Sequence, residues 1–555
     1  MTAETHESDE LTALARAWLA DDPDPAARLE LRRLLADLPA SRAELADRFA
    51  GPLTFGTAGL RGPLRAGPNG MNLAVVTRAA AGLVGWLAQR GGSGPLVVGY
   101  DARHGSREFA ERTARVATGA GRPALLLPRP LPTPVLAYAV RALDAVAGVM
   151  VTASHNPPQD NGYKVYLGAE LGGDRGAGAQ IVPPADVEIE AAIREVVVLA
   201  EVPLGEPGEV LGEEIVTGYL DRAVAALAPD GQRDLTVAYT PLHGVGGPVL
   251  VDAFVRAGFT APAMVAEQAE PDPLFPTVAF PNPEEPGATD LLLTLAQSTG
   301  ADIAIANDPD ADRCAVAVPV EGGWRMLSGD EVGALLADHL MRRGTRALYA
   351  TTIVSSSLLR AMCAARDLPY AETLTGFKWI VRAGAGTEHP LGYGYEEALG
   401  YCVAPDHVRD KDGITAALLV AELAAGLKVT GRTLTDRLDE LAAEFGVHQT
   451  DQVSIRVTDL REIAATMARL RTATPGTLLG HPVTAVEDRM PESDVLILRS
   501  ATTRVVIRPS GTEPKLKAYL EVVEPVADGD VGGARSRAAT AVAALRTEIA
   551  TALRR

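Results

Sequence analysis

A serine, a histidine and a lysine lie close together in the stretch TASHNPPQDNGYKVY, residues 152–166. A serine hydroxyl can act as a nucleophile, a histidine can carry a proton, and a lysine supplies a positive charge. Ser154, His155 and Lys164 are therefore candidates for group-transfer chemistry. The alternative is an ordinary proline-containing turn with polar residues on its surface, and this stretch alone favours neither interpretation.

A second candidate site lies in ADIAIANDPDADR, residues 301–313. Asp308, Asp310 and Asp312 occupy alternate positions after an apolar run, and side chains two apart in extended backbone point the same way. Three carboxylates can bind one hard divalent cation, and we expect Mg²⁺. A calcium EF-hand is excluded, because Arg313 and Pro319 stand where that loop needs glycine and glutamate. A solvated acidic turn would leave three like charges crowded together.

The third candidate site is a phosphate-binding loop in VVIRPSGTEPKLKAY, residues 505–519. Backbone N–H groups, two hydroxyls and a guanidinium suit the tetrahedral oxygens of a phosphate, and an arginine can bind two of them at once. The alternative is a polar hairpin turn, which has no need of this cluster. The predicted loop lies between two strands and carries Arg508, Ser510, Gly511, Thr512 and Lys515.

Three shorter stretches give weaker signals. Arg61 stands in the small-residue loop TFGTAGLRG, residues 54–62, and Lys378 follows a glycine in TGFKWI. Glu396 and Glu397 stand in GYGYEEALGY, where carboxylates on a flexible loop can accept hydrogen bonds from sugar hydroxyls. No sequence typical of P-loop nucleotide-binding proteins, serine hydrolases or zinc proteases is present.

The elements that must position these residues follow from local patterns. Prolines fix φ and Asn-Gly favours a tight reversal, so residues 145–166 predict a strand, a stiff loop and a second strand. Three segments, 96–121, 235–259 and 347–368, each read as a short apolar run, a small-residue turn and a helix-period stretch, which is the opening of a βα unit.

We therefore predict an α/β protein with three similar α/β domains containing mixed sheets and a smaller α+β C-terminal domain. Its first fifty residues predict a helical lead-in, with Ser41 and Glu44 as a capping box. The expected domains are residues 1–213 with the serine loop, 214–325 with the aspartate loop, 326–446 with the glutamate pair and 447–555 with the phosphate loop.

Composition limits the partners and the compartment. The 555 residues carry 52 Lys plus Arg against 71 Asp plus Glu, and this net charge of −19 argues against nucleic acid or an anionic membrane as partner. Cys314, Cys363 and Cys402 are scattered and odd in number, which is typical of a reducing compartment. The acidic N-terminus does not read as a signal peptide, so we expect a cytoplasmic protein.

The motifs TASHNPP, DPDADR, GYEEALGY and RPSGTEPK, in that order, resemble the α-D-phosphohexomutase family, and TFGTAGLRG fits the same family's opening. The resemblance covers roughly residues 54–519. In the details of its motifs, the chain is most similar to the phosphoglucomutase-2 and phosphopentomutase branch of the family. The resemblance implies four domains around a central cleft, and a phosphosugar mutase that interconverts hexose 1-phosphate and hexose 6-phosphate through a phosphoserine enzyme and a sugar bisphosphate. It also implies one Mg²⁺ per chain, a sugar 1,6-bisphosphate as activator or intermediate, and a monomer or homodimer.

The resemblance also implies a role for each candidate residue. Ser154 would carry the phosphoryl group, and the three aspartates with Ser154 would bind the metal. His155 or Lys164 would move the proton, and Arg61 and Arg313 would steady the site. The remaining candidates would bind the sugar (Glu396, Glu397) and the non-reacting phosphate (Lys378, Arg508, Ser510, Gly511, Thr512, Lys515).

One departure from the family pattern concerns the choice of sugar. Many hexomutase relatives carry serine two residues after the glutamate that matches Glu396, whereas this chain has Ala398. Glucose and mannose phosphates are the first expectation, and a pentose phosphate such as ribose 1-phosphate is the rival. A phosphatase with Asp308 as nucleophile also matches a strand followed by D-x-D, but it leaves the Ser154 and Arg508 loops unexplained. A non-catalytic sugar-phosphate sensor is a third alternative.

Overall fold

The computed structural model describes residues 3–56, 59–457, 459–510 and 515–554. The chain divides into two compact units. The first comprises Met1–Met326 and Gly400–Glu422, and the second comprises Leu327–Leu399 and Leu423–Arg555.

The chain begins with three helices, as the sequence predicted: α1 (Ala3–Asp21), α2 (Pro25–Ala36) and α3 (Arg42–Arg48). They pack around a small buried cluster that includes Leu31 and Leu45. The predicted capping box is wrong. Ser41 donates its hydroxyl to the carbonyl of Leu34 at 2.5 Å, and the carboxylate of Glu44 pairs with Arg48 at 2.7 Å.

The first sheet has the order β1-β5-β4-β2-β3-β7, with β6 beside β5. Strands β4, β2, β3 and β7 run parallel, whereas β1, β5 and β6 pair antiparallel, so the sheet is mixed. All five residues of both β2 and β4 are buried, as in strands covered on both faces. The elements are β1 (Leu60–Pro63), α4 (Leu73–Gln89), β2 (Leu96–Tyr100), α5 (Ser106–Gly119), β3 (Ala124–Leu126), α6 (Thr133–Ala142), β4 (Ala147–Val151), β5 (Asp160–Leu167), α7 (Ala169–Gly176), β6 (Ala179–Gln180), α8 (Ala185–Arg194), η1 (Leu199–Glu201) and β7 (Glu209–Val210).

The second sheet of the first unit has the order β12-β11-β10-β8-β9 and is also mixed. Its elements are α9 (Glu214–Ala225), β8 (Val237–Thr240), α10 (Gly246–Arg256), β9 (Ala263–Met264), η2 (Ala266–Gln268), α11 (Asp290–Thr299), β10 (Ile303–Ala306), β11 (Ala315–Val320) and β12 (Gly323–Met326). The returning segment Gly400–Glu422 adds β16 (Gly400–Cys402) and the first part of α15 (Gly413–Lys428) to this unit.

The second unit contains a parallel arrangement in which β13 lies between β14 and β15. The surrounding elements are α12 (Gly329–Arg342), β13 (Leu348–Thr352), α13 (Leu358–Ala365), β14 (Tyr370–Thr373), α14 (Phe377–Ile380), β15 (Leu391–Glu396) and α16 (Leu434–Phe445).

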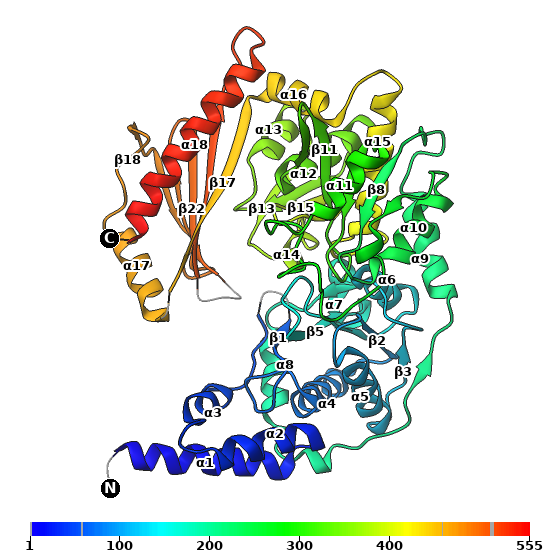
Figure 1. The fold of residues 1–555 in the computed structure, drawn as a ribbon, viewed down its shortest axis with the longest axis vertical. Coiled ribbons are helices and arrows are strands. Elements are labelled where there is room, and N and C mark those ends of the chain that lie inside the picture. The colour runs from blue at the N-terminus through cyan, green and yellow to red at the C-terminus, as the bar shows by residue number, and fades with distance from the viewer. Residues whose placement is uncertain (1–2, 57–58, 458, 511–514, 555) are drawn as a thin grey trace. The chain divides into compact units, whose positions relative to one another are not determined.

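The C-terminal part of the second unit is an antiparallel sheet of order β17-β23-β22-β21-β20. The last helix buries Ala534, Ala538, Val542, Leu545 and Ile549 at helical spacing and lies along this sheet (Figure 1). The elements are β17 (Val447–Arg456), α17 (Leu460–Thr472), β18 (Thr477–Leu478), β19 (His481–Pro482), β20 (Ala485–Asp488), β21 (Leu496–Arg499), β22 (Thr503–Pro509), β23 (Lys515–Glu524) and α18 (Val531–Arg554). The predicted α/β class with mixed sheets and a smaller C-terminal α+β domain is confirmed.

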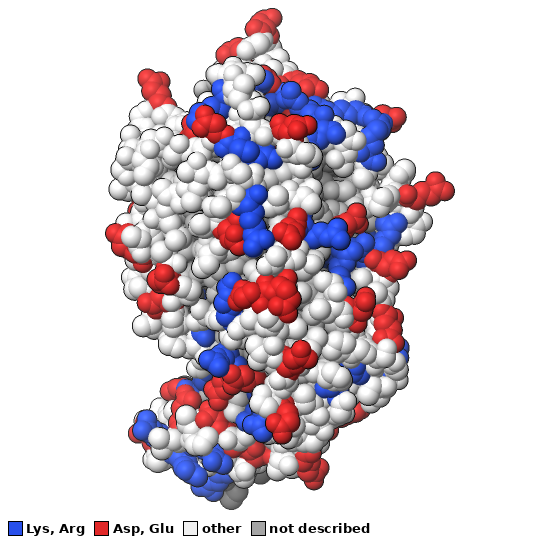
Figure 2. Space-filling model, turned by 90° about the vertical axis from the view of Figure 1, so that its right-hand side faces the viewer, with Lys and Arg blue, Asp and Glu red and all other residues white. Residues whose placement is uncertain are grey.

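The charges on the surface are mixed. Basic and acidic side chains are interspersed over the face shown in Figure 2. Across the described part of the chain, no helix is both long and apolar enough to cross a membrane.

Candidate active site

Ser154 lies in the loop that joins β4 to β5, so the predicted arrangement of strand, loop and strand is confirmed. Its backbone has φ of 51°, in the left-handed region that a serine seldom adopts. The amide of Ser154 donates to the hydroxyl of Thr152 at 2.9 Å, which holds this conformation, and the residue is 1% exposed. Such backbone strain is typical of functional loops.

Arg103, which lies between β2 and α5, forms hydrogen bonds with the same loop. Its guanidinium donates to the carbonyls of Ser154 at 2.6 Å, Asn156 at 2.5 Å, Pro157 at 2.8 Å and Asp160 at 3.1 Å. These bonds give four carbonyl groups of the loop a charged hydrogen-bond donor. The serine loop is therefore rigid because a single buried side chain spans it.

The aspartate triad meets Ser154. Asp308, Asp310 and Asp312 are all fully buried, and their carboxylate oxygens lie within 4.8 Å of one another. The hydroxyl of Ser154 donates to Oδ2 of Asp308 at 2.7 Å. The convergence is as expected, but the extended backbone is not. Ala311 has φ of 52° and its amide bonds to the carbonyl of Asp308 at 2.8 Å, so a turn gathers the carboxylates.

Two buried lysines balance the triad. Nζ of Lys164 lies 2.7 Å from Oδ2 of Asp310 and 3.1 Å from Oδ2 of Asp312, and Nζ of Lys411 lies 3.0 Å from Asp312. Burial disfavours the charged form of Lys164, but the two carboxylates outweigh it and raise its pKa. Burial likewise opposes ionisation of Asp310, yet Lys164 lowers the pKa of this carboxyl below its usual value.

The triad also fits a divalent cation. Among the described residues, Oδ1 of Asp310 and Oδ1 of Asp312 are buried and accept no hydrogen bond. Burial raises the pKa of Asp308 well above its usual value, and the charges of the other two aspartates add to the rise. Oxygen ligands at this spacing are those that Mg²⁺ prefers, and a cation would satisfy the orphaned oxygens.

The other candidates of the first unit lie around Ser154. Nδ1 of His155 is 3.2 Å from the Ser154 hydroxyl. Burial, with the positive charges of Arg313 and Arg61, lowers the pKa of His155 well below its usual value. Nη1 of Arg61 donates to Asn156 at 3.3 Å, from strand β1 rather than from the predicted loop. Nε of Arg313 lies 3.9 Å from both Asp308 and Asp312.

Sequence reasoning missed the segment that brings Lys411 to the triad. Its neighbour Asp410 accepts hydrogen bonds from Tyr166 at 2.7 Å and Gln180 at 2.9 Å. A Cβ on Gly413 would lie 2.2 Å from the carbonyl of Arg313, so only glycine permits this close approach. The run of charges ending in glycine, DKDG at 410–413, was the available signal.

The remaining candidates belong to the second unit. Glu396 ends β15 rather than lying in the predicted loop, and Lys378 lies on α14. Arg508 lies within β22 and Lys515 begins β23, with Ser510 between them and its amide bonded to the carbonyl of Lys515 at 2.7 Å. The predicted phosphate-binding residues Gly511 and Thr512 lie outside the described residues.

A buried serine hydroxyl held against clustered carboxylates that fit a divalent cation, on an α/β scaffold with mixed sheets, is typical of group-transfer enzymes. Comparison with known protein families supports this class. Models described as phosphoglucomutase/phosphomannomutase match this chain with alpha/beta/alpha domain I at residues 52–196, domain II at 217–322, domain III at 328–445 and the C-terminal domain at 453–531.

Individual relatives cover most of the chain. A probable phosphomannomutase of Haemophilus influenzae is 46% identical over 461 residues, which cover 81% of this chain and 93% of the relative. A phosphopentomutase of Mus musculus is 33% identical and covers 92% of this chain and 90% of its own length. The crystal structure of a putative phosphomannomutase from Thermus thermophilus has a TM-score of 0.69 at 26% identity, covering 89% of this chain and 99% of that one.

The chain therefore belongs to the phosphoglucomutase/phosphomannomutase family. It is a phosphomutase, an isomerase that acts by phosphoryl transfer. The family depends on Mg²⁺, and the triad provides a site that fits this ion.

Proposed function

We propose that the chain interconverts hexose 1-phosphates and hexose 6-phosphates, with glucose or mannose as the sugar, through a phosphorylated Ser154 and a sugar bisphosphate. The observation that carries this proposal is the 2.7 Å hydrogen bond between the Ser154 hydroxyl and Asp308, made by a buried serine in a strained backbone conformation. A structural serine needs neither the strain nor the carboxylates.

Ser154, Asp308, Asp310 and Asp312 would hold the Mg²⁺, which when bound would neutralise charge on the transferred phosphoryl group. Of the two proposed proton carriers, His155 lies within reach of the Ser154 hydroxyl, whereas Lys164 is held by two carboxylates. We therefore assign proton transfer to His155. Lys164, with Arg61 and Arg313, would hold negative charge in place.

The two transfers balance. In the first, the free hydroxyl of the sugar phosphate loses its proton to His155 and bonds to phosphorus, while the bond between Ser154 Oγ and phosphorus breaks and Ser154 Oγ takes up the proton. In the second, Ser154 Oγ gives this proton to His155 and bonds to the other phosphate of the bisphosphate, whose bond to the sugar oxygen breaks while that oxygen takes up the proton. The sugar 1,6-bisphosphate is thus the intermediate, and the same compound would activate unphosphorylated enzyme.

The second unit would bind the rest of the substrate. The segment that carries Glu396 and Glu397 is proposed to supply the sugar contact, and the non-reacting phosphate would be held by the residues predicted for it (Lys378, Arg508, Ser510, Gly511, Thr512, Lys515). Support comes from Tyr519 of β23. Burial and the charges of both glutamates raise the pKa of Tyr519, while the neighbouring Arg508 lowers it, so these charged groups act on one hydroxyl.

A pentose phosphate is the second candidate substrate. The murine relative that covers 92% of this chain is named phosphopentomutase, and Ala398 removes one hydroxyl from the proposed sugar site. Turnover of ribose 1-phosphate beside glucose, mannose and glucosamine 1-phosphates decides between the sugars. We also propose a cytoplasmic location, supported by cysteines that are all buried and free in the described chain.

The proposed function is tested by Ser154→Ala. Intact-mass analysis of the wild type should place one phosphate on Ser154, and the variant should lose both that phosphate and turnover with every sugar phosphate. Ser298→Ala, which truncates an exposed serine, is the matched control and should behave as wild type. Turnover retained by Ser154→Ala would instead indicate an aspartate nucleophile, and tight binding without turnover by the wild type would indicate a sensor.

A further inference from the structure

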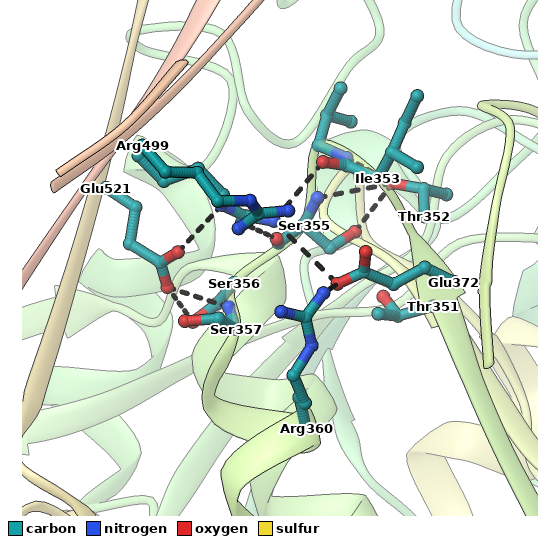
Figure 3. A network of polar contacts seen from close by, with 12 residues as sticks. Thr351, Thr352, Ile353, Ser355, Ser356, Ser357, Arg360, Glu372, Arg499 and Glu521 are labelled. Carbon is teal, nitrogen blue, oxygen red and sulfur yellow. Dashed lines mark hydrogen bonds and ion pairs between the residues drawn. The ribbon is translucent and has the colours of Figure 1, made fainter. Parts of the chain in front are cut away.

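The two strands that carry the proposed phosphate loop both contact one loop of the second unit. This Ser/Thr loop, TTIVSSS at residues 351–357, joins β13 to α13. From β22, Arg504 donates to the carbonyls of Ile353 at 3.3 Å and of Ser355. From β23, the carboxylate of Glu521 accepts from the hydroxyl of Ser356 at 2.8 Å and the amide of Ser357 at 2.7 Å (Figure 3).

The contact is buried and paired. Nε of Arg504 lies 3.0 Å from Oε2 of Glu521, and both side chains are at most 6% exposed. Burial opposes ionisation of Glu521, but Arg504, His448 and the amide of Ser357 together outweigh it and lower the pKa of Glu521 to about 2. Beside these polar contacts, Ile353 of the Ser/Thr loop and Val506 of β22 belong to one buried apolar cluster. The phosphate-loop strands are therefore fixed to the Ser/Thr loop.

The same loop holds Glu397. The hydroxyl of Ser355 donates to Oε2 of Glu397 at 2.9 Å and lies 3.3 Å from its backbone amide, which donates to it. Thr352 donates its hydroxyl to the same carboxylate oxygen at 3.2 Å. Ser355 and Thr352 are at most 1% exposed, so this oxygen of Glu397 is bound to the protein interior.

Glu397 lies between Glu396, which is proposed to face the sugar, and Ala398, which replaces the serine of many family members. Fixing its amide and its carboxylate through one hydroxyl fixes the course of the backbone on either side. Ser355 is also the residue whose carbonyl accepts from Arg504. One residue thus joins the strand that leads to Arg508 with the segment that carries the glutamates.

We infer that Glu397 is a positioning residue rather than a sugar ligand, and that Ser355, anchored by Arg504, sets the place of the sugar segment relative to the phosphate-loop strands. This deepens the proposed function, on which it rests, because the spacing between a phosphate grip and a sugar contact selects the length of the substrate. When a residue that contacts the substrate is displaced by a small distance, we expect the substrate to bind more weakly by on the order of tenfold or more.

The test compares Ser355→Ala with Ser357→Ala, two identical truncations in one loop, of which only the first touches Glu397. Calorimetry measures the affinity of each protein for glucose 1-phosphate and for inorganic phosphate. Ser355→Ala should bind glucose 1-phosphate about tenfold more weakly and inorganic phosphate as the wild type does. Ser357→Ala should match the wild type with both ligands. Weakening of both ligands by Ser355→Ala would mean general damage and would overturn the inference.

A double-mutant cycle then separates positioning from direct contact. If Glu397 acts through Ser355, Glu397→Ala and the double variant should bind glucose 1-phosphate no more weakly than Ser355→Ala within about twofold, because interacting residues are not additive. Independent, multiplied losses would make Glu397 a sugar ligand and overturn the inference. These are binding measurements, so absence of turnover in the wild type contradicts the proposed function alone.

Discussion

Arg103 shows how one side chain can hold the loop that carries Ser154. It donates to backbone carbonyls along residues 154–160, and its Nε lies 3.4 Å from Oδ2 of Asp101 in a pair that is 1% exposed on both sides. Asp101 also accepts the hydroxyl of Ser106 at 2.6 Å. Removing the guanidinium would leave a buried carboxylate and several carbonyls without their donor.

We therefore expect Arg103→Met to lower the free energy of unfolding by about 3 kcal/mol, the usual cost of breaking a buried ion pair from one side. Urea unfolding followed by circular dichroism measures it. Arg107→Met is the control, since Arg107 pairs with Glu111 on an exposed helix face and contributes little. Equal losses in the two variants would show that Arg103 does not hold the loop.

The residues near Ser154 could be predicted because their signals are local. Prolines and Asn-Gly act over a few positions, so the loop followed from residues 152–166 alone. Lys411 could not be found this way, because it reaches Asp312 only after the chain has left the first unit and returned. Ser355 could not be found from the sequence either, because its role depends on the hydrogen bond that its hydroxyl donates to Glu397 in the folded chain.

At the scale of elements, Asp330 joins four segments of the second unit. From the first turn of α12, its carboxylate accepts from the amide of Ser356 at 2.7 Å, the hydroxyl of Tyr395 at 3.0 Å and the hydroxyl of Thr450 at 3.1 Å. Burial raises the pKa of Asp330 to about 7, although the Ser356 amide opposes the rise. The charges of Glu397 and Glu521 add to the increase.

A raised pKa of a carboxyl group means that the fold favours the protonated form. Between the ordinary value of 3.8 and about 7, the folded chain holds a proton that the unfolded chain has lost, so this group lowers stability as pH rises through that window. Asp330→Asn should therefore match the wild type near pH 4 and exceed its unfolding free energy above pH 7, by up to about 4 kcal/mol.

Urea unfolding of the second unit across this pH range is the measurement. Glu492→Gln, at an exposed position of the same unit, is the control and should leave the pH dependence unchanged. Parallel curves for wild type and Asp330→Asn would show that Asp330 is not the group responsible. Glu521 has the opposite effect at lower pH. Because its pKa is lowered from 4.5 to about 2 in the fold, its ionised carboxylate stabilises the folded state above pH 4.5, and this stabilisation is lost as the pH falls from 4.5 toward 2.

Element types were easier to predict than their local geometry. The helical lead-in and the strand before the aspartates followed from periodicity, yet the capping box at Ser41 and the extended backbone of the triad were wrong. At Ser41 the hydroxyl donates to the carbonyl of Leu34 instead of capping the helix, and at the triad a local turn in which the amide of Ala311 donates to the carbonyl of Asp308 presents the carboxylates. Propensity constrains an element, whereas contacts fix its ends.

At the scale of the whole molecule, the first unit is discontinuous in sequence. The segment Gly400–Glu422 falls within the family's domain III at residues 328–445 but belongs to the first unit. It supplies Lys411 to the triad and Asp412 to the hydroxyl of Tyr219 at 2.8 Å. The metal site of the first unit is thus complete only when the chain has passed through the second.

Because the triad lies wholly in the first unit, Mg²⁺ should stabilise that unit in particular. A ligand that binds only the folded state at a concentration of one hundred times its Kd adds about 2.7 kcal/mol. Multidomain chains often melt in more than one step. In calorimetry of the full chain we expect Mg²⁺ to raise one transition and EDTA to reverse the rise, while the transition that moves with Asp330→Asn stays unchanged.

Asp310→Asn should abolish the rise, since it removes a carboxylate of the site, whereas Asp230→Asn, at an exposed position of the same unit, should preserve it. The effect needs no turnover, so it tests the metal site separately from catalysis. If Mg²⁺ raised both transitions alike, or if Asp310→Asn still responded, the ion would bind elsewhere. The triad would then be a buried acidic cluster neutralised by side chains, among them Lys164, Lys411 and Arg313.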